Sequence, residues 1–102
     1  MTDLTGKVFV ITGGNGGIGL GLAEGIAKAG GAIAIWARNE EKNAESVSKL
    51  KSLGVSAHAY VCDVSKENDV KESMIRTLED FGHINGLFAN AGRAGSGTPF
   101  VD

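Results

Sequence analysis

The sequence contains a single cysteine, Cys62, so no disulfide can form within the chain, which fits a reducing compartment. No apolar run approaches the roughly 18 residues that a membrane span requires. The first residues, MTDLTGK, lack the apolar core of a signal peptide. The net charge is only −2, so nothing favours a nucleic acid or an anionic membrane as a partner. We therefore expect a cytoplasmic protein that binds neither.

Histidine and proline are also scarce. His58 and His83 are the two histidines, and neither has a matching ligand partner, so we expect no metal site. The length of 102 residues allows one domain, and 42% apolar with 22% charged residues is typical of a globular protein. Glycine, in contrast, occurs 16 times, about twice its usual share of roughly 7%. The placement of these glycines is therefore the most informative feature.

Many of the glycines follow a short apolar run near the amino terminus. Val8 to Ile11 is typical of a buried strand, and six glycines follow between Gly13 and Gly21. A helix start presents unpaired N–H groups and a positive dipole end, and glycines let an anion approach the backbone. The stretch therefore predicts a strand, a turn and a helix that bind a pyrophosphate. The helix is expected to pack through apolar residues at helical spacing, Ile18, Leu22, Ile26 and Ala29.

Two glycine patterns fit this turn. One is G-x-G-x-x-G, at Gly14, Gly16 and Gly19. The other is T-G-x-x-x-G-x-G, which begins directly at the strand end and is preferred, at Thr12, Gly13, Gly17 and Gly19. A P-loop is excluded because no Gly-Lys-Ser/Thr follows. A tight turn without ligand is the alternative, but each glycine costs roughly 0.5–1 kcal/mol of chain entropy. At Gly17 and Gly19 we expect that a Cβ would collide with the pyrophosphate or with the strand beneath.

Strands and helices alternate along the rest of the chain. Further strands are expected at 32–37, 55–62 and 84–89, the second of these with one polar face, as at a sheet edge. Right-handed crossovers make such strands parallel, in the order 3-2-1-4 of a doubly wound sheet. Ligands bind such sheets beyond the carboxyl ends of the strands.

The two later helices have start and stop signals. Asn39 and Ser65 can cap their first turns, and Gly54 and Gly82 can end them. Their core faces are expected at Ala44, Val47 and Leu50, and at Val70, Met74, Leu78 and Phe81.

The glycine stretch Thr12-Gly13-Gly14-Asn15-Gly16-Gly17-Ile18-Gly19 resembles the cofactor motif of the short-chain dehydrogenase/reductase family. The resemblance implies an α/β fold, a Rossmann-type doubly wound parallel sheet. Residues 1–102 would form the N-terminal β-α-β-α-β-α-β portion of an NAD(P)-binding domain. The resemblance also implies cofactor contacts at Gly13, Asn15, Gly16, Gly17, Ile18 and Gly19.

The end of the second strand bears on the choice of cofactor. NAD-binding folds often place an acid here to hold the ribose 2′-OH, but this chain has Ala37. Arg38 follows and can pair with a 2′-phosphate, as in family members that prefer NADP. We therefore expect NADP, with NAD as the alternative, and count Arg38 and Asn39 as cofactor residues. The other interpretation of Arg38 is a solvent-exposed arginine, and Gly16 lacks the basic residue of one NADP-type variant.

Two more motifs follow the third and fourth strands. The resemblance assigns Asp63 and Val64 to the adenine pocket, although Asp63 could instead form an Asx turn ahead of Ser65. Asn90-Ala91-Gly92 resembles the family's N-N-A-G motif, with Ala89 in place of the first asparagine. This motif lines the cofactor ribose in the family and steadies the central sheet.

The resemblance places the catalytic serine and the Tyr-x-x-x-Lys pair beyond the fourth strand. Tyr60 is the only tyrosine, and Val64 stands four residues later, so we assign no catalytic residue. We expect the 102-residue chain to be inactive by itself. The full-length enzyme would transfer a hydride between nicotinamide and a small carbonyl or alcohol substrate, as a homo-oligomer. The alternatives are a nucleotide-sensing half-domain without catalysis and a truncated product with no independent function.

Overall fold

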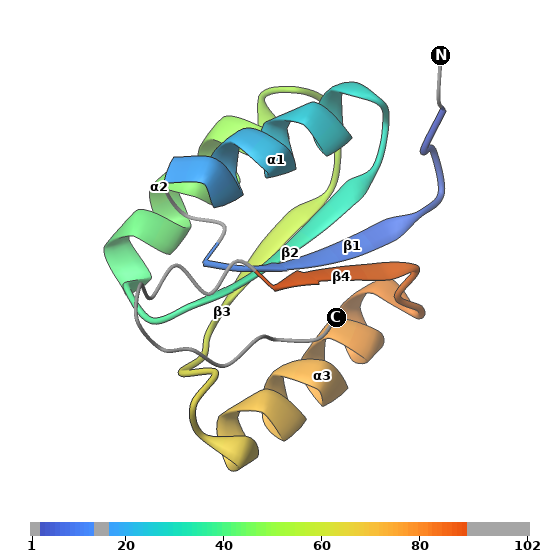
Figure 1. The fold of residues 1–102 in the computed structure, drawn as a ribbon. Coiled ribbons are helices and arrows are strands. Elements are labelled where there is room, and N and C mark those ends of the chain that lie inside the picture. Colours follow the sequence, from blue (N-terminus) through green and yellow to red (C-terminus); the bar gives the residue numbers. More distant parts are fainter. Residues whose placement is uncertain (1–2, 14–16, 90–102) are drawn as a thin grey trace.

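The computed structural model describes residues 3–13 and 17–89, in which strands and helices alternate strictly (Figure 1). The elements, in chain order, are β1 (Val8–Thr12), α1 (Gly17–Lys28), β2 (Ala32–Ala37), α2 (Glu40–Lys51), β3 (Ala57–Val61), α3 (Glu67–Phe81) and β4 (Gly86–Ala89).

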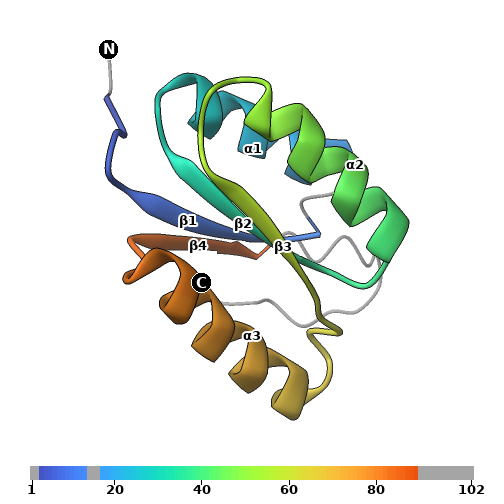
Figure 2. The same ribbon diagram turned by 180° about the vertical axis from the view of Figure 1, so that it is seen from behind.

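The strands form one parallel sheet in the order β3-β2-β1-β4. Helices α1 and α2 cover one face of this sheet and α3 covers the other (Figures 1 and 2). The predicted α/β class, the parallel sheet and the strand order are confirmed, with β3 at one edge. Thr12 of β1 lies opposite Trp36 of β2 and Ala89 of β4, so these strands end level with one another.

The two inner strands are buried on both faces, which explains why their sequences are continuous apolar runs. Toward α1 and α2 the sheet contributes Ile11, Ile33 and Ile35, none of which reaches solvent. Toward α3 it contributes Val10, Ala34 and Trp36, which are also buried. The sheet is therefore a rigid support for the loops at its carboxyl edge.

Helix α1 packs through a different face from the one predicted. Its buried residues are Gly19, Ala23, Ile26 and Ala27, of which only Ile26 was expected. Ile18 is 82% exposed and Leu22 is 37% exposed. Small side chains let the helix backbone lie close to the sheet, and the longer apolar residues at its start remain outside.

Helix α2 also packs through residues that differ in part from those predicted. Asn39 is its N-cap, as predicted, and its Oδ1 accepts a hydrogen bond of 2.9 Å from the Lys42 backbone N–H. Leu50 is buried and Val47 is half-buried, but Ala44 is exposed. The remaining buried positions are polar, Asn43 and Ser46.

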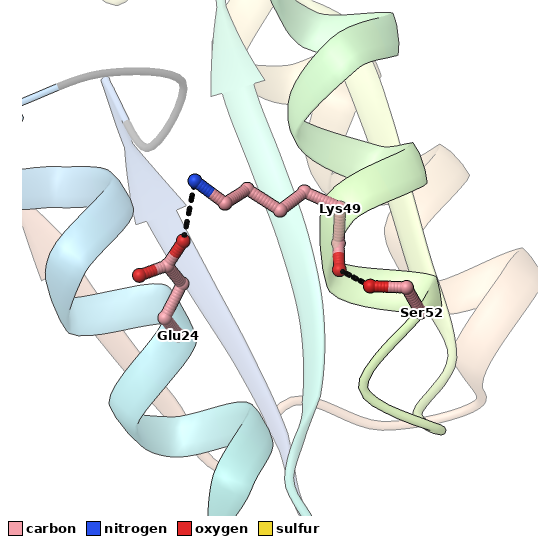
Figure 3. Close-up of polar contacts among 3 residues, drawn as sticks. All are labelled: Glu24, Lys49 and Ser52. Carbon is pink, nitrogen blue, oxygen red and sulfur yellow. Dashed lines mark hydrogen bonds and ion pairs between the residues drawn. The ribbon is translucent and has the colours of Figure 1, made fainter.

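An ion pair joins the outer surfaces of these two helices (Figure 3). Lys49 Nζ of α2 lies 3.2 Å from Glu24 Oε2 of α1, and the Lys49 side chain is 61% exposed. The Lys49 carbonyl also accepts a bond from the Ser52 hydroxyl, which closes the end of α2. Exposed pairs of this kind contribute about 0–1 kcal/mol. The apolar contacts beneath the helices therefore hold α1 and α2 in place.

The predicted cap of α3 is wrong. The helix begins at Glu67, and its N-cap position is Lys66, which makes no side-chain capping bond. Ser65 lies outside the helix because its N–H and hydroxyl both donate to Asp63 Oδ1, at 3.0 and 2.7 Å.

The buried centre of α3 is also polar. Ser73 and Thr77 are its buried residues, whereas Val70, Met74 and Phe81 flank them and Leu78 is 42% exposed. Trp36 explains this arrangement, because its indole N–H donates to Thr77 Oγ1 at 3.1 Å. The Thr77 hydroxyl in turn donates to the Ser73 carbonyl at 2.7 Å.

None of the helices in the described part of the chain has the length and apolar character needed to cross a membrane.

The hydrogen bond from the Trp36 indole to Thr77 predicts the effect of changing Thr77, which is fully buried. Thr77→Val keeps the shape of the side chain but leaves the Trp36 indole N–H without its acceptor. We expect the free energy of unfolding to fall by about 1–3 kcal/mol. Thr77→Ser keeps the hydroxyl and loses only a methyl group, at about 0.8 kcal/mol. Urea denaturation of the two variants measures the difference, and a valine variant as stable as the unchanged protein would contradict the account.

Candidate functional site

The carboxyl edge of the sheet brings together the first residues after three strands. The Gly13 N–H, just after β1, donates to the Trp36 carbonyl at 2.9 Å. The Cys62 N–H, just after β3, donates to the Ala37 carbonyl at 3.1 Å. Trp36 and Ala37, which supply the two acceptors, are the last two residues of β2. The loops that follow β1, β2 and β3 therefore leave the sheet side by side.

The turn between β1 and α1 depends on glycine at both of its described ends. Gly13 has φ +67° and Gly17 has φ +57°, a conformation that L side chains rarely adopt. An added Cβ at Gly17 would meet no atom of the described chain within 4 Å. The expected clash with the strand beneath is therefore wrong for Gly17, and the backbone angle is what requires glycine. Asn15 and Gly16 lie outside the described residues.

The start of α1 suits an anion. The helix has no acidic residue in its first turn, so nothing there opposes its positive dipole end. Gly19 is buried, and Ile18 is 82% exposed. Gly17, Ile18 and Gly19 are the first three residues of α1, and Gly13 is the first residue after β1.

The turn between β2 and α2 carries Arg38 and Asn39. Arg38 is exposed, and Ala37, just before it, is buried. The Asn39 Oδ1 accepts from the Lys42 N–H and the Asn39 carbonyl accepts from the Asn43 N–H, so both oxygens are bonded to the first turn of α2. The described part of this turn therefore offers one cation and no carboxylate at the end of β2.

Asp63 forms a turn of its own. Its Oδ1 accepts from both the N–H and the hydroxyl of Ser65, so the Asx-turn alternative is what the structure shows for this oxygen. The Ser65 bonds, followed by the charges of Arg38 and Lys66, lower the pKa of Asp63. The carboxylate therefore stays ionised at neutral pH.

Val64 is half-buried and packs against the apolar cluster beneath α3. Its assignment to an adenine pocket remains a prediction. Asn90, Ala91 and Gly92 lie outside the described residues. Ala89, which precedes them, ends β4 opposite Thr12 at this same edge.

The remaining polar residues have structural partners. The Tyr60 hydroxyl donates to Asp80 Oδ2 at 2.5 Å, and burial together with this carboxylate raises the pKa of Tyr60. Cys62 is buried, and burial raises the pKa of its thiol. His58 packs edge-on against Phe81, with ring centroids 5.2 Å apart. Within residues 3–13 and 17–89, no group of three His, Cys, Asp or Glu side chains could hold a metal ion.

One buried polar residue near the site is not predicted from the sequence. The Asn43 amide, from the first turn of α2, donates to the Ala37 carbonyl at 2.9 Å. At its position in a helix an asparagine is ordinarily a surface residue, so helical spacing gives no signal for it.

Comparison with known proteins identifies the family. A family model described as short chain dehydrogenase matches residues 7–101. A sorbose reductase of Candida albicans is 40% identical over 98% of this chain, and a probable NADP-dependent mannitol dehydrogenase of Yarrowia lipolytica is likewise 40% identical over 98%. The match spans 36% of the length of each of these proteins.

Solved structures give the same answer. The L-sorbose reductase of Gluconobacter frateurii, complexed with NADPH and L-sorbose, superposes with a TM-score of 0.88 and 35% identity, over 95% of this chain and 37% of that one. A NAD+-bound xylitol dehydrogenase superposes with a TM-score of 0.80 and 38% identity, over 82% of this chain and 32% of that one. The parallel sheet, the glycine turn at its carboxyl edge and the match over nearly the whole chain lead to one conclusion: this chain belongs to the short-chain dehydrogenase family.

Proposed function

We propose that this chain is the dinucleotide-binding portion of an oxidoreductase that moves a hydride between nicotinamide and a carbonyl or alcohol substrate. The observation that carries the proposal is the β1–α1 turn, where two positive-φ glycines lead into a helix start free of acidic residues. Such a helix start binds phosphate through its N–H groups and its dipole. The pyrophosphate of the cofactor would lie there, on Gly13, Asn15, Gly16, Gly17, Ile18 and Gly19.

Arg38 supports NADP as the preferred cofactor. Its exposed guanidinium stands at the end of β2, beside a buried alanine that offers no acceptor to a free ribose 2′-OH. A charged hydrogen bond to a 2′-phosphate contributes roughly 1.5–3 kcal/mol, or about ten- to a hundredfold in affinity. The relatives include both an NADPH complex and a NAD+ complex, and we assign the choice between the two cofactors to the residues at this turn.

The adenosine end would then lie between the loops that follow β2, β3 and β4. Asp63 Oδ1 is occupied by Ser65, so a contact with the adenine edge would use the other carboxylate oxygen. The Val64 backbone would complete the adenine pocket. Asn90, Ala91 and Gly92 would line the ribose, as the family resemblance implies.

The names of the relatives support a sugar or sugar alcohol as the substrate class, since they include a sorbose reductase, a mannitol dehydrogenase and a xylitol dehydrogenase. The catalytic serine and the Tyr-x-x-x-Lys pair would belong to a part of the enzyme other than these 102 residues. We propose that the full-length enzyme is cytoplasmic and homo-oligomeric.

The first test concerns the phosphate site. Gly17→Ala in the full-length enzyme places a methyl group on a backbone with φ +57° at the helix start. We expect the dissociation constant for NADPH to rise at least about tenfold, because a charge-assisted bond worth roughly 1.5–3 kcal/mol is weakened. Calorimetric titration measures the constant, and circular dichroism checks the fold.

Gly25→Ala is the matched control. Gly25 lies two turns further along α1, exposed, and its added Cβ would meet no described atom within 4 Å. This variant should keep its affinity for NADPH and gain about 0.5–1 kcal/mol of stability, because alanine suits a helix interior better than glycine. Equal affinities in the two variants would place the phosphates elsewhere.

The second test concerns the 2′-phosphate. Ala37→Asp combined with Arg38→Leu adds an acceptor for a free 2′-OH and removes the cation. We expect the ratio of kcat/KM for NADPH over that for NADH to fall by about a hundredfold or more, because a contribution of roughly 1.5–3 kcal/mol to NADPH binding is lost and one of similar size to NADH binding is gained. Arg38→Lys, which keeps the charge but not the planar pair of donors, should retain part of the preference for NADPH. A full-length enzyme that already prefers NADH would show that Arg38 is only a surface residue.

A further inference from the structure

The carbonyl oxygen of Ala37 accepts two hydrogen bonds. It accepts one hydrogen bond of 3.1 Å from the Cys62 N–H and a second of 2.9 Å from the side-chain amide of Asn43. Ala37 is 7% exposed and Asn43 is 3% exposed, so both bonds lie in the interior, out of competition with water. The first bond continues the sheet, whereas the second ties the end of β2 to a helix.

Asn43 also holds the other side of the same turn. Its backbone N–H donates to the Asn39 carbonyl at 2.9 Å, as the first bond of α2. Asn43 is therefore bonded through its side chain to the residue before Arg38 and through its backbone to the residue after it. Arg38 is the one residue between these two anchors.

We propose that Asn43 is a positioning residue for cofactor selection: its buried amide fixes the β2–α2 turn and so the direction in which Arg38 leaves the sheet. This inference rests on the proposed function, in which Arg38 binds the 2′-phosphate of NADP. A long, exposed arginine has many rotamers, so a fixed backbone beneath it limits the positions that its guanidinium can occupy. A bidentate contact with a phosphate depends on such geometry.

The role differs from that of an ordinary core residue. If Asn43 is removed, the Ala37 carbonyl keeps its bond to the Cys62 N–H, so the sheet does not lose its last pairing. The side-chain link between β2 and the first turn of α2 is lost. The phosphate site at the start of α1 uses other residues and should keep its affinity for the part of the cofactor that NADH and NADPH share.

Asn43→Leu in the full-length enzyme is the central variant, because leucine has a similar size and no donor. We expect the preference for NADPH over NADH, measured as the ratio of dissociation constants, to fall at least fivefold. The constant for NADH should stay within about twofold of that of the unchanged enzyme. Ser46→Ala is the matched control, since Ser46 is another 3% exposed polar residue of α2, one turn further along, and it should leave the ratio unchanged.

A double-mutant cycle tests whether Asn43 acts through Arg38. In an Arg38→Leu background, Asn43→Leu should have no further effect on the NADPH to NADH ratio. An equal loss of affinity for both cofactors, an unchanged ratio, or a further fall of the ratio in the Arg38→Leu background would each overturn the inference. If Asn43→Leu does not fold, Asn43→Ala is measured in the same way, and failure of both to fold would make Asn43 a structural residue only. An unchanged enzyme that binds neither cofactor would instead refute the proposed function.

Discussion

The last two carbonyl groups of β2 hold the ends of the strands on either side. The Trp36 carbonyl binds the first residue after β1, and the Ala37 carbonyl binds the first residue after β3. These two bonds bring Gly13, Arg38 and Asp63 to one edge of the sheet. The candidate site depends on this alignment, because the three residues are far apart in the sequence and follow three different strands.

The site divides into a part made by the backbone and a part made by a side chain. The glycine turn and the start of α1 offer N–H groups, which recognise a phosphate but do not distinguish NAD from NADP. In the proposed site, the group that distinguishes the two cofactors would be the exposed guanidinium of Arg38, on a turn to which Asn43 is bonded through its side chain and its backbone. Affinity and selectivity would therefore rest on separate elements, so either could change without the other.

The sequence alone predicts the strands and their order, because apolar runs bounded by glycines mark buried parallel strands and right-handed crossovers restrict their arrangement. It predicts the faces of the helices poorly. Ile18, Ala44 and Leu78 fit the helical spacing and yet are exposed. The buried positions belong to small or polar residues whose partners lie elsewhere in the chain: Thr77 serves the indole of Trp36, and Asn43 serves the carbonyl of Ala37.

The candidate site shows the same limit. The turn after β1 can be predicted because glycine is the residue that most readily adopts the positive φ angles found at Gly13 and Gly17. Asn39 can be predicted as a cap because capping bonds are local. Ser65 is wrongly predicted as a cap because its hydroxyl bonds to Asp63, two residues before it, and a capping bond would join it to a residue about as close on the other side. Spacing cannot decide between two local bonds of similar strength, and it cannot reveal that Asn43 faces the sheet.

A crystal structure of the full-length enzyme with NADPH tests the central claim most directly. The account predicts the pyrophosphate against the N–H groups at the start of α1, the 2′-phosphate within hydrogen-bond distance of the Arg38 guanidinium, and the adenine between Arg38 and Asp63. A cofactor bound away from the carboxyl edge of the sheet, or a 2′-phosphate directed away from Arg38, would contradict it.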